Sequence, residues 1–231
     1  MKRRTLTTGL ISAGSLWALS AWLPARAATL GEGDAALGVR AALERGAASA
    51  VSMLGKSGGF LDNPKVRIPL PGFLDEVAKL AKFTGQQHRV DELITAMNRA
   101  AEAAVPEAKP LLLSAIKTMS VQDGRQILTG GDNSVTEFFA SKTREPLSVK
   151  FLPIVTKATE KVSLAEKYNA LAGKAASTGL VSKDDANIQQ YVTGKALDGL
   201  YLMIGEEERK IRQDPIATGS AILSKVFGSL K

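Results

Sequence analysis

The sequence contains no cysteine, a single histidine (His88) and only two tryptophans, Trp17 and Trp22. Without cysteine the protein has no disulfide, no thiolate metal site, no covalently attached haem and no thiol nucleophile. One histidine would leave a zinc or copper site dependent on carboxylates, which those metals seldom use alone. A Ser-His-Asp triad would rest on the same single histidine. We therefore expect no metal and no cofactor, and we interpret His88 as solvent-facing.

Residues 1–27 have the three parts of a bacterial secretory signal peptide. Residues 2–4 form a positively charged end, residues 6–23 carry no charge, and Ala25-Arg26-Ala27 is a small-x-small cleavage site. We expect cleavage after Ala27 and a periplasmic or secreted protein, with membrane contact only through the precursor signal. Residues 28–34 then form a flexible leader, and residues 35–231 form one domain.

Two alternatives to this export pathway stay open. The uncharged stretch approaches the ~20 residues that span a bilayer, so the segment could remain as an anchor. Arg3-Arg4-Thr5-Leu6 also resembles a twin-arginine signal, which would export a folded protein in place of the Sec-type route.

Most of the positive charge belongs to the signal. It holds four of the 30 lysines and arginines and no acidic residue, so the formal net charge falls from +7 to +3 on cleavage. The remaining basic residues form no block of the kind that binds nucleic acid. Both tryptophans leave as well, so the core is built mainly from Leu, Ile, Val and Ala. A nucleic-acid partner is not expected.

The mature chain has the apolar spacing and the capping signals of an all-α protein, including predicted capping boxes at Ser120 with Asp123 and at Ser134 with Glu137. We expect one compact multi-helix domain without strands, interrupted by one Pro-rich strap. The expected helices cover residues 34–54, 73–83, 90–105, 110–119, 121–128, 134–142, 146–161, 163–171 and 183–205, with a last helix from Asp214-Pro215. In the helix at 183–205 the predicted inward positions are Ile188, Tyr191, Val192, Ala196, Leu200 and Ile204.

The strap covers residues 60–72, where prolines alternate with apolar residues and exclude a regular helix. An extended apolar segment of this kind can take part in docking. Asp198-Gly199 lies inside the longest expected helix, where glycine costs about 1 kcal/mol and so indicates close packing or room for a ligand. We assign the candidate ligand or partner surface to a set of seven residues from these segments and the helix at 90–105: Val66, Arg67, Ile68, Leu70, Asn98, Asp198 and Gly199.

Two pairs of charged residues are the candidates for catalysis. Arg99 and Glu102 lie one turn apart on the expected helix at 90–105, where Glu102 could be a general base and Arg99 an anion clamp. Asp123 and Arg125 are the second pair. Asn98 and Glu102 share one side of their helix, which equally fits a polar network that fixes helix packing, and we favour that interpretation.

A series of short motifs in a fixed order resembles a family of exported bacterial proteins. The motifs are Gly59-Phe60, Asn63-Pro64, Val66 to Pro71, Met97 to Glu102, Ala115 to Met119, Asp123 with Ile127-Leu128, Gly131-Asp132, Thr143, Tyr168, Ala196 to Leu200, and Glu207 through Ile211-Arg212-Asp214-Pro215. The resemblance is to the family called domain of unknown function 4197 and covers residues 37–227. It implies no activity and no catalytic residue.

Two functions of different classes fit these observations. The one we favour is a non-enzymatic periplasmic module that binds an apolar small molecule, a lipid or an envelope protein. The alternative is a hydrolase or lyase that uses carboxylates and arginines, which requires Arg99, Glu102, Asp123 and Arg125 to converge in one pocket.

Overall fold

The computed structural model describes residues 32–74, 79, 82–131, 133–160, 162–177 and 187–214. Several predictions lie outside these residues: the signal peptide at 1–27, most of the helix at 73–83, the helix start at 182–186 and the last helix from Pro215. Among the described residues the secondary structure is helical and contains no strand, so the all-α prediction is confirmed.

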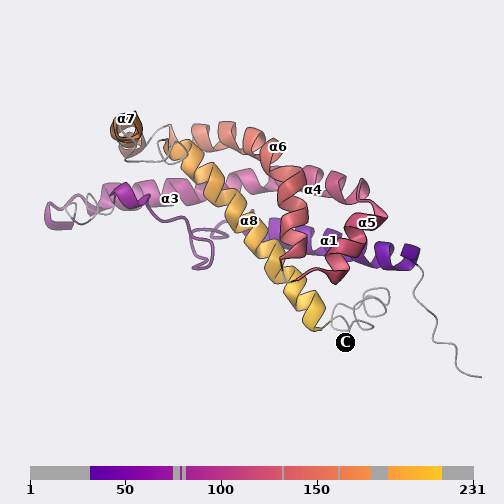
Figure 1. Ribbon diagram of the computed structural model, residues 1–231. Coiled ribbons are helices and arrows are strands. Elements are labelled where there is room, and N and C mark those ends of the chain that lie inside the picture. The colour runs from indigo at the N-terminus through magenta and orange to yellow at the C-terminus, as the bar shows by residue number, and fades with distance from the viewer. Residues whose placement is uncertain are drawn as a thin grey trace, which may run out of the picture.

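The described elements follow the predicted order closely (Figure 1). They are α1 (Glu32–Leu54), the 3-10 turn η1 (Gly72–Leu74), α3 (Gln87–Ala104), the 3-10 turn η2 (Val105–Glu107), α4 (Ala108–Lys117), α5 (Val121–Thr129), α6 (Ser134–Thr159), α7 (Ser163–Ser177) and α8 (Ile188–Gln213). Between α1 and η1 the chain forms turns up to residue 66 and has no regular structure at 67–71. Helix α1 starts two residues before the predicted position.

Helix α8 is the element on which the others converge. It crosses the molecule diagonally from the α7 end towards α5 and contacts α6, α1, α3 and α7 (Figure 1). The six inward positions predicted for this helix are all buried. Aliphatic and aromatic side chains from α3 and α6, including Met97, Phe139 and Phe151, complete one continuous core.

The prediction of separate helices at 134–142 and 146–161 was wrong, because α6 runs through Pro146 and Pro153. A proline inside a helix removes one hydrogen bond and displaces the carbonyl four residues earlier. Both prolines are exposed on α6, so water can reach the displaced carbonyls. Buried Leu147 and Phe151 pack the helix onto the core on both sides of Pro146, and this tertiary burial outweighs the local cost.

Several predicted helix boundaries were also wrong. The predicted capping box at Ser134 is absent: Ser134 lies inside α6, and its hydroxyl donates to the Ile127 carbonyl oxygen at 3.0 Å. Helix α7 ends at Ser177 instead of 171, and α8 begins at Ile188, after the Asn187 cap, instead of 183. Helix α8 also continues eight residues beyond 205, where Glu208 and Ile211 are buried. The box formed by Ser120 and Asp123 at the start of α5 is confirmed.

Candidate binding site

The segment of residues 60–71, called the strap from here on, is bound to α3 through the buried side chain of Asn98. Its Oδ1 accepts the backbone N–H of Ile68 at 2.8 Å, and its Nδ2 donates to the Ile68 carbonyl at 3.0 Å. Nδ2 also donates to the Ile94 carbonyl at 2.8 Å. One amide thus satisfies both backbone groups of a buried residue that has no partner in a sheet or helix.

Glu102, one turn further along α3, holds the start of the strap. Its Oε1 accepts the N–H groups of Phe60 and Leu61, both at 3.1 Å, and its Oε2 accepts from Arg99 at 2.6 Å. Arg99 in turn donates to Ser57 Oγ at 2.7 Å. Burial alone would raise the pKa of Glu102, but the bonds from Leu61, Arg99 and Phe60 together lower it. A carboxylate that is fully engaged and holds its proton weakly is poorly suited to general-base chemistry near neutral pH.

The other side of the strap packs against α8 at Gly199. A Cβ on this glycine would lie 2.8 Å from Phe60 Cε1 and 3.2 Å from Val66 Cβ, so only glycine admits the strap this closely. The Tyr191 hydroxyl donates to the Pro69 carbonyl at 3.1 Å. The strap is therefore held between α3 and α8.

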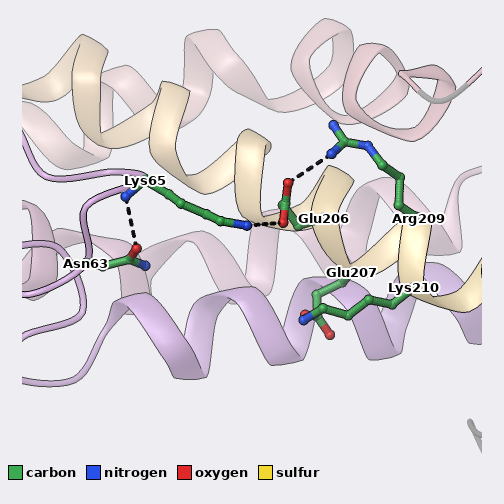
Figure 2. Close-up of polar contacts among 6 residues, drawn as sticks. All are labelled: Asn63, Lys65, Glu206, Glu207, Arg209 and Lys210. Carbon is green, nitrogen blue, oxygen red and sulfur yellow. Dashed lines mark hydrogen bonds and ion pairs between the residues drawn. The ribbon is translucent and has the colours of Figure 1, made fainter.

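An ion pair at the edge of this contact links the strap to the later part of α8 (Figure 2). Lys65 Nζ lies 2.5 Å from Glu206 Oε2, and Arg209 binds the other oxygen of Glu206 at 2.8 Å. The Lys65 backbone N–H donates to Asn63 Oδ1 at 3.2 Å, which closes a turn within the strap. Because Lys65 is exposed, we expect the pair to orient side chains more than it stabilises the fold.

Between the strap and α8 lies an open hollow of about 220 Å³, called the strap groove from here on. Residues 65–69 form one wall, and Lys195, Asp198, Gly199 and Leu202 of α8 form the other. A second hollow of about 440 Å³, the α6 groove, lies between α8 and α6 and shares Lys195 and Asp198 with the first. The two grooves therefore adjoin along one side of α8.

Some of the charged residues that line the two grooves form ion pairs, and others do not. Arg144 of α6 lies 2.6 Å from Asp198 and also stacks over the ring of Tyr201, 5.3 Å from its centre. Lys195 lies over the ring of Tyr191 at 5.7 Å. Among the described residues, no carboxylate lies within ion-pair distance of Lys195 or Arg67. The strap groove thus carries two cations without an acidic partner.

Five of the seven residues predicted for a ligand or partner surface line the strap groove: Val66, Arg67, Ile68, Asp198 and Gly199. Leu70 is half-buried against the core instead, and Asn98 lies behind the strap, where it binds Ile68. The side chains of Val66 and Ile68 are themselves buried, so the strap presents its backbone and its charged residues at the rim more than its apolar ones.

The four catalytic candidates fall into two separate pairs. Arg99 and Glu102 join α3 to the strap, whereas Asp123 closes the capping box of α5 and Arg125 is exposed on that short helix. Asp123 lines a hollow between α5 and α6 whose lining includes neither Arg99 nor Glu102. The four side chains are not brought together into one site.

Several residues that line these grooves were not predicted from the sequence. Lys195 and Leu202 occupy helix positions that look like ordinary solvent-facing ones, and Thr193 looks like a core residue. One feature of the sequence could have located the groove: Gly194, another glycine of α8, lies five residues before Gly199. A Cβ on Gly194 would meet no atom within 4 Å, so this glycine leaves open space where Gly199 admits a neighbour.

The end of α8 is partly buried, although residues 206–212 are mostly charged. Glu208 is buried and pairs with Arg212 at 2.6 Å, while Arg212 also donates to the Ile127 carbonyl. Burial raises the pKa of Glu208 despite the opposing effect of Arg212. This pair joins α8 to the α5–α6 connection and lies outside both grooves.

Neither metal binding nor membrane spanning is indicated by the described part of the chain. Its His, Asp and Glu residues include no group of three or more placed to hold a metal ion. None of its helices is long and apolar enough to cross a bilayer.

A family model described as "Protein of unknown function (DUF4197)" matches residues 29–228. The chain belongs to this family. The match includes the strap, α3, α8 and both grooves, so the candidate site lies within the DUF4197 domain, and the resemblance inferred from the sequence is confirmed. Comparisons with curated proteins and with solved structures find no match.

Replacing Asn98 is expected to destabilise this DUF4197 protein by about 3 kcal/mol, because Asn98→Ala leaves the buried N–H and carbonyl of Ile68 without partners. Urea denaturation measures the change. Thr95→Ala, an exposed position on the same helix, is the control and should change stability by less than about 0.5 kcal/mol. Equal effects of the two substitutions would contradict the anchoring role of Asn98.

Gly194 and Gly199 of α8 are expected to respond in opposite directions to alanine. Gly199→Ala should destabilise the DUF4197 domain by about 2 kcal/mol, because its methyl group overlaps Phe60 and Val66. Gly194→Ala meets open space and should stabilise the helix by up to about 1 kcal/mol. Denaturation of both variants checks this; stabilisation by Gly199→Ala would show that the strap does not approach α8 this closely.

The contribution of Glu102 is expected to depend on pH. Its pKa in the folded protein lies below the unfolded value of 4.5, so its stabilisation is complete above that pH and is lost as the pH falls through the folded pKa. Glu102→Gln should cost about 2 kcal/mol at pH 7, since the amide faces Arg99 with a donor. The difference from the wild type should shrink on acidification, as measured by denaturation at pH 7 and below pH 4; a constant difference would refute the assignment.

Proposed function

We propose that this protein is exported and acts in the bacterial cell envelope as a non-enzymatic binding module, with the strap groove as its binding site. The proposal rests on one observation: hydrogen bonds hold the strap, which forms one wall of the groove, in a fixed position. Asn98, Glu102 and Tyr191 hold the strap through buried or half-buried hydrogen bonds, so the wall has its shape before any ligand arrives. A preformed groove avoids the entropic cost of ordering a loop on binding.

The chemistry of the groove supports binding over catalysis. Asp198 is paired with Arg144. Glu102, the carboxylate best placed to act as a base, accepts hydrogen bonds from the backbone of the strap. The hydrolase or lyase alternative has no assembled site among the described residues and gains no support from a specific observation.

The export part of the proposal rests on the pattern at residues 1–27. Intact-mass analysis of the protein expressed in a bacterium tests it: removal of residues 1–27 should leave a chain that begins at Ala28. Recovery of the uncleaved precursor from the envelope fraction would show that the segment is retained as an anchor.

Native mass spectrometry of the mature protein purified from the periplasm is the test of binding. We expect an added mass or a co-purifying envelope partner that is lost in Leu202→Asp, because this substitution places a negative charge on the groove wall. Leu202 is 39% exposed, so the change should leave the fold intact. Val149→Asp, an exposed apolar position on α6 outside both grooves, is the matched control.

A clean apo mass with no partner would overturn the proposed function. Equal loss of the bound species in Leu202→Asp and Val149→Asp would place the binding site elsewhere.

A further inference from the structure

The strap groove combines uncompensated positive charge with an apolar wall. Lys65 is neutralised by Glu206 and Arg144 by Asp198, whereas Arg67 and Lys195 have no carboxylate partner among the described residues. The groove therefore has a local excess of positive charge in a chain whose mature sequence is nearly balanced. Such a site favours an anionic ligand.

An apolar surface lies directly beside these cations. Leu202 lies one turn beyond the buried Gly199 on α8, with 39% of its surface exposed. An exposed leucine next to unpaired cations fits a ligand that carries both an acid group and an apolar part.

The backbone of the strap discriminates between two classes of such ligand. An extended peptide would add to the strap through main-chain hydrogen bonds. The N–H groups of Val66 and Arg67 already donate to the Asn63 carbonyl at 3.2 and 2.8 Å, and that of Ile68 donates to Asn98. Pro69 has no N–H, and its carbonyl accepts from Tyr191. The strap has no N–H left at residues 66–69 for a peptide, whereas an alkyl chain requires none.

We propose that the ligand is a monomeric anionic amphiphile, a single-chain acid such as a fatty acid or an alkyl phosphate. Its acid group binds Arg67 and Lys195, and its alkyl chain lies along α8 against Leu202. This inference rests on the proposed function and specifies the ligand class for the same groove.

Isothermal titration calorimetry of the mature protein with dodecanoate, below its critical micelle concentration, tests this inference. Arg67→Gln and Lys195→Gln are each expected to raise Kd roughly tenfold, which corresponds to about 1.4 kcal/mol. Both side chains are exposed, so neither change should unfold the protein. Lys117→Gln, an exposed position at the end of α4, removes one positive charge outside the groove and should leave Kd unchanged.

Further ligands separate the possible sources of the acid group and of the affinity. Dodecanol, which has the same chain without charge, should bind at least tenfold more weakly than dodecanoate. Dodecyl phosphate tests whether carboxylate or phosphate is preferred, and tight binding of either supports the proposal. Binding to vesicles with anionic lipids but to neither monomer would overturn it in favour of a membrane surface.

Two outcomes distinguish failure of this inference from failure of the proposed function. If no anionic amphiphile binds, but native mass spectrometry finds another species that Leu202→Asp removes, the ligand class is wrong and the binding function stands. Equal effects of Arg67→Gln and Lys117→Gln on dodecanoate affinity would likewise overturn the assignment of the acid site.

Discussion

The structure depends on the hydrogen bonds between side chains of α3 and the backbone of a segment that is neither helix nor strand. In an all-helical domain, a buried strap has no sheet edge to pair with, and each unpaired buried backbone group costs about 1–3 kcal/mol. Asn98 supplies a donor and an acceptor to Ile68, and Glu102 supplies two acceptor positions to Phe60 and Leu61. Because these side chains lie one turn apart on one rigid helix, they fix the strap in one register, and the groove beside α8 inherits that geometry.

Polar residues in the middle of an amphipathic helix can line a catalytic cleft or form a packing network, and sequence alone does not distinguish the two. The i,i+4 spacing of Asn98 and Glu102 fits a catalytic cleft as well as a packing network. The hydrogen-bond partners of Asn98 and Glu102 distinguish the two: both side chains bind the strap, some thirty to forty residues away in sequence. Glu102 and Glu208 show the same dependence on surroundings. Backbone donors lower the pKa of the first, whereas burial raises the pKa of the second beside Arg212.

Much of the fold was predictable because it follows from local rules. The apolar spacing located α1, α3 and α8, and the Ser120–Asp123 box marked the start of α5. The failures share one cause, which is that tertiary burial overrides a local signal. Pro146 does not end α6 because Leu147 and Phe151 are buried on the core, and α8 does not end at Gly205 because residues 208 and 211 beyond it are buried. Within the site, the strap and Gly199 were recognisable from proline and glycine, but Lys195 and Leu202 belong to it only through the approach of the strap.

The backbone hydrogen bonds that stabilise the strap also limit which ligands the groove can recognise. Because the N–H groups of residues 66–68 already bond to other groups of the protein, this wall of the groove has little with which to select a peptide sequence, and selectivity passes to the side chains at the rim. There the pairing of Arg144 and Lys65 leaves Arg67 and Lys195 as the available charges. Charge attraction supplies orientation, and contact with Leu202 supplies affinity in proportion to the apolar area covered. A site built in this way discriminates by the ligand's charge and chain length, which is the selectivity that a carrier of amphiphiles needs and that a sequence-specific adaptor does not.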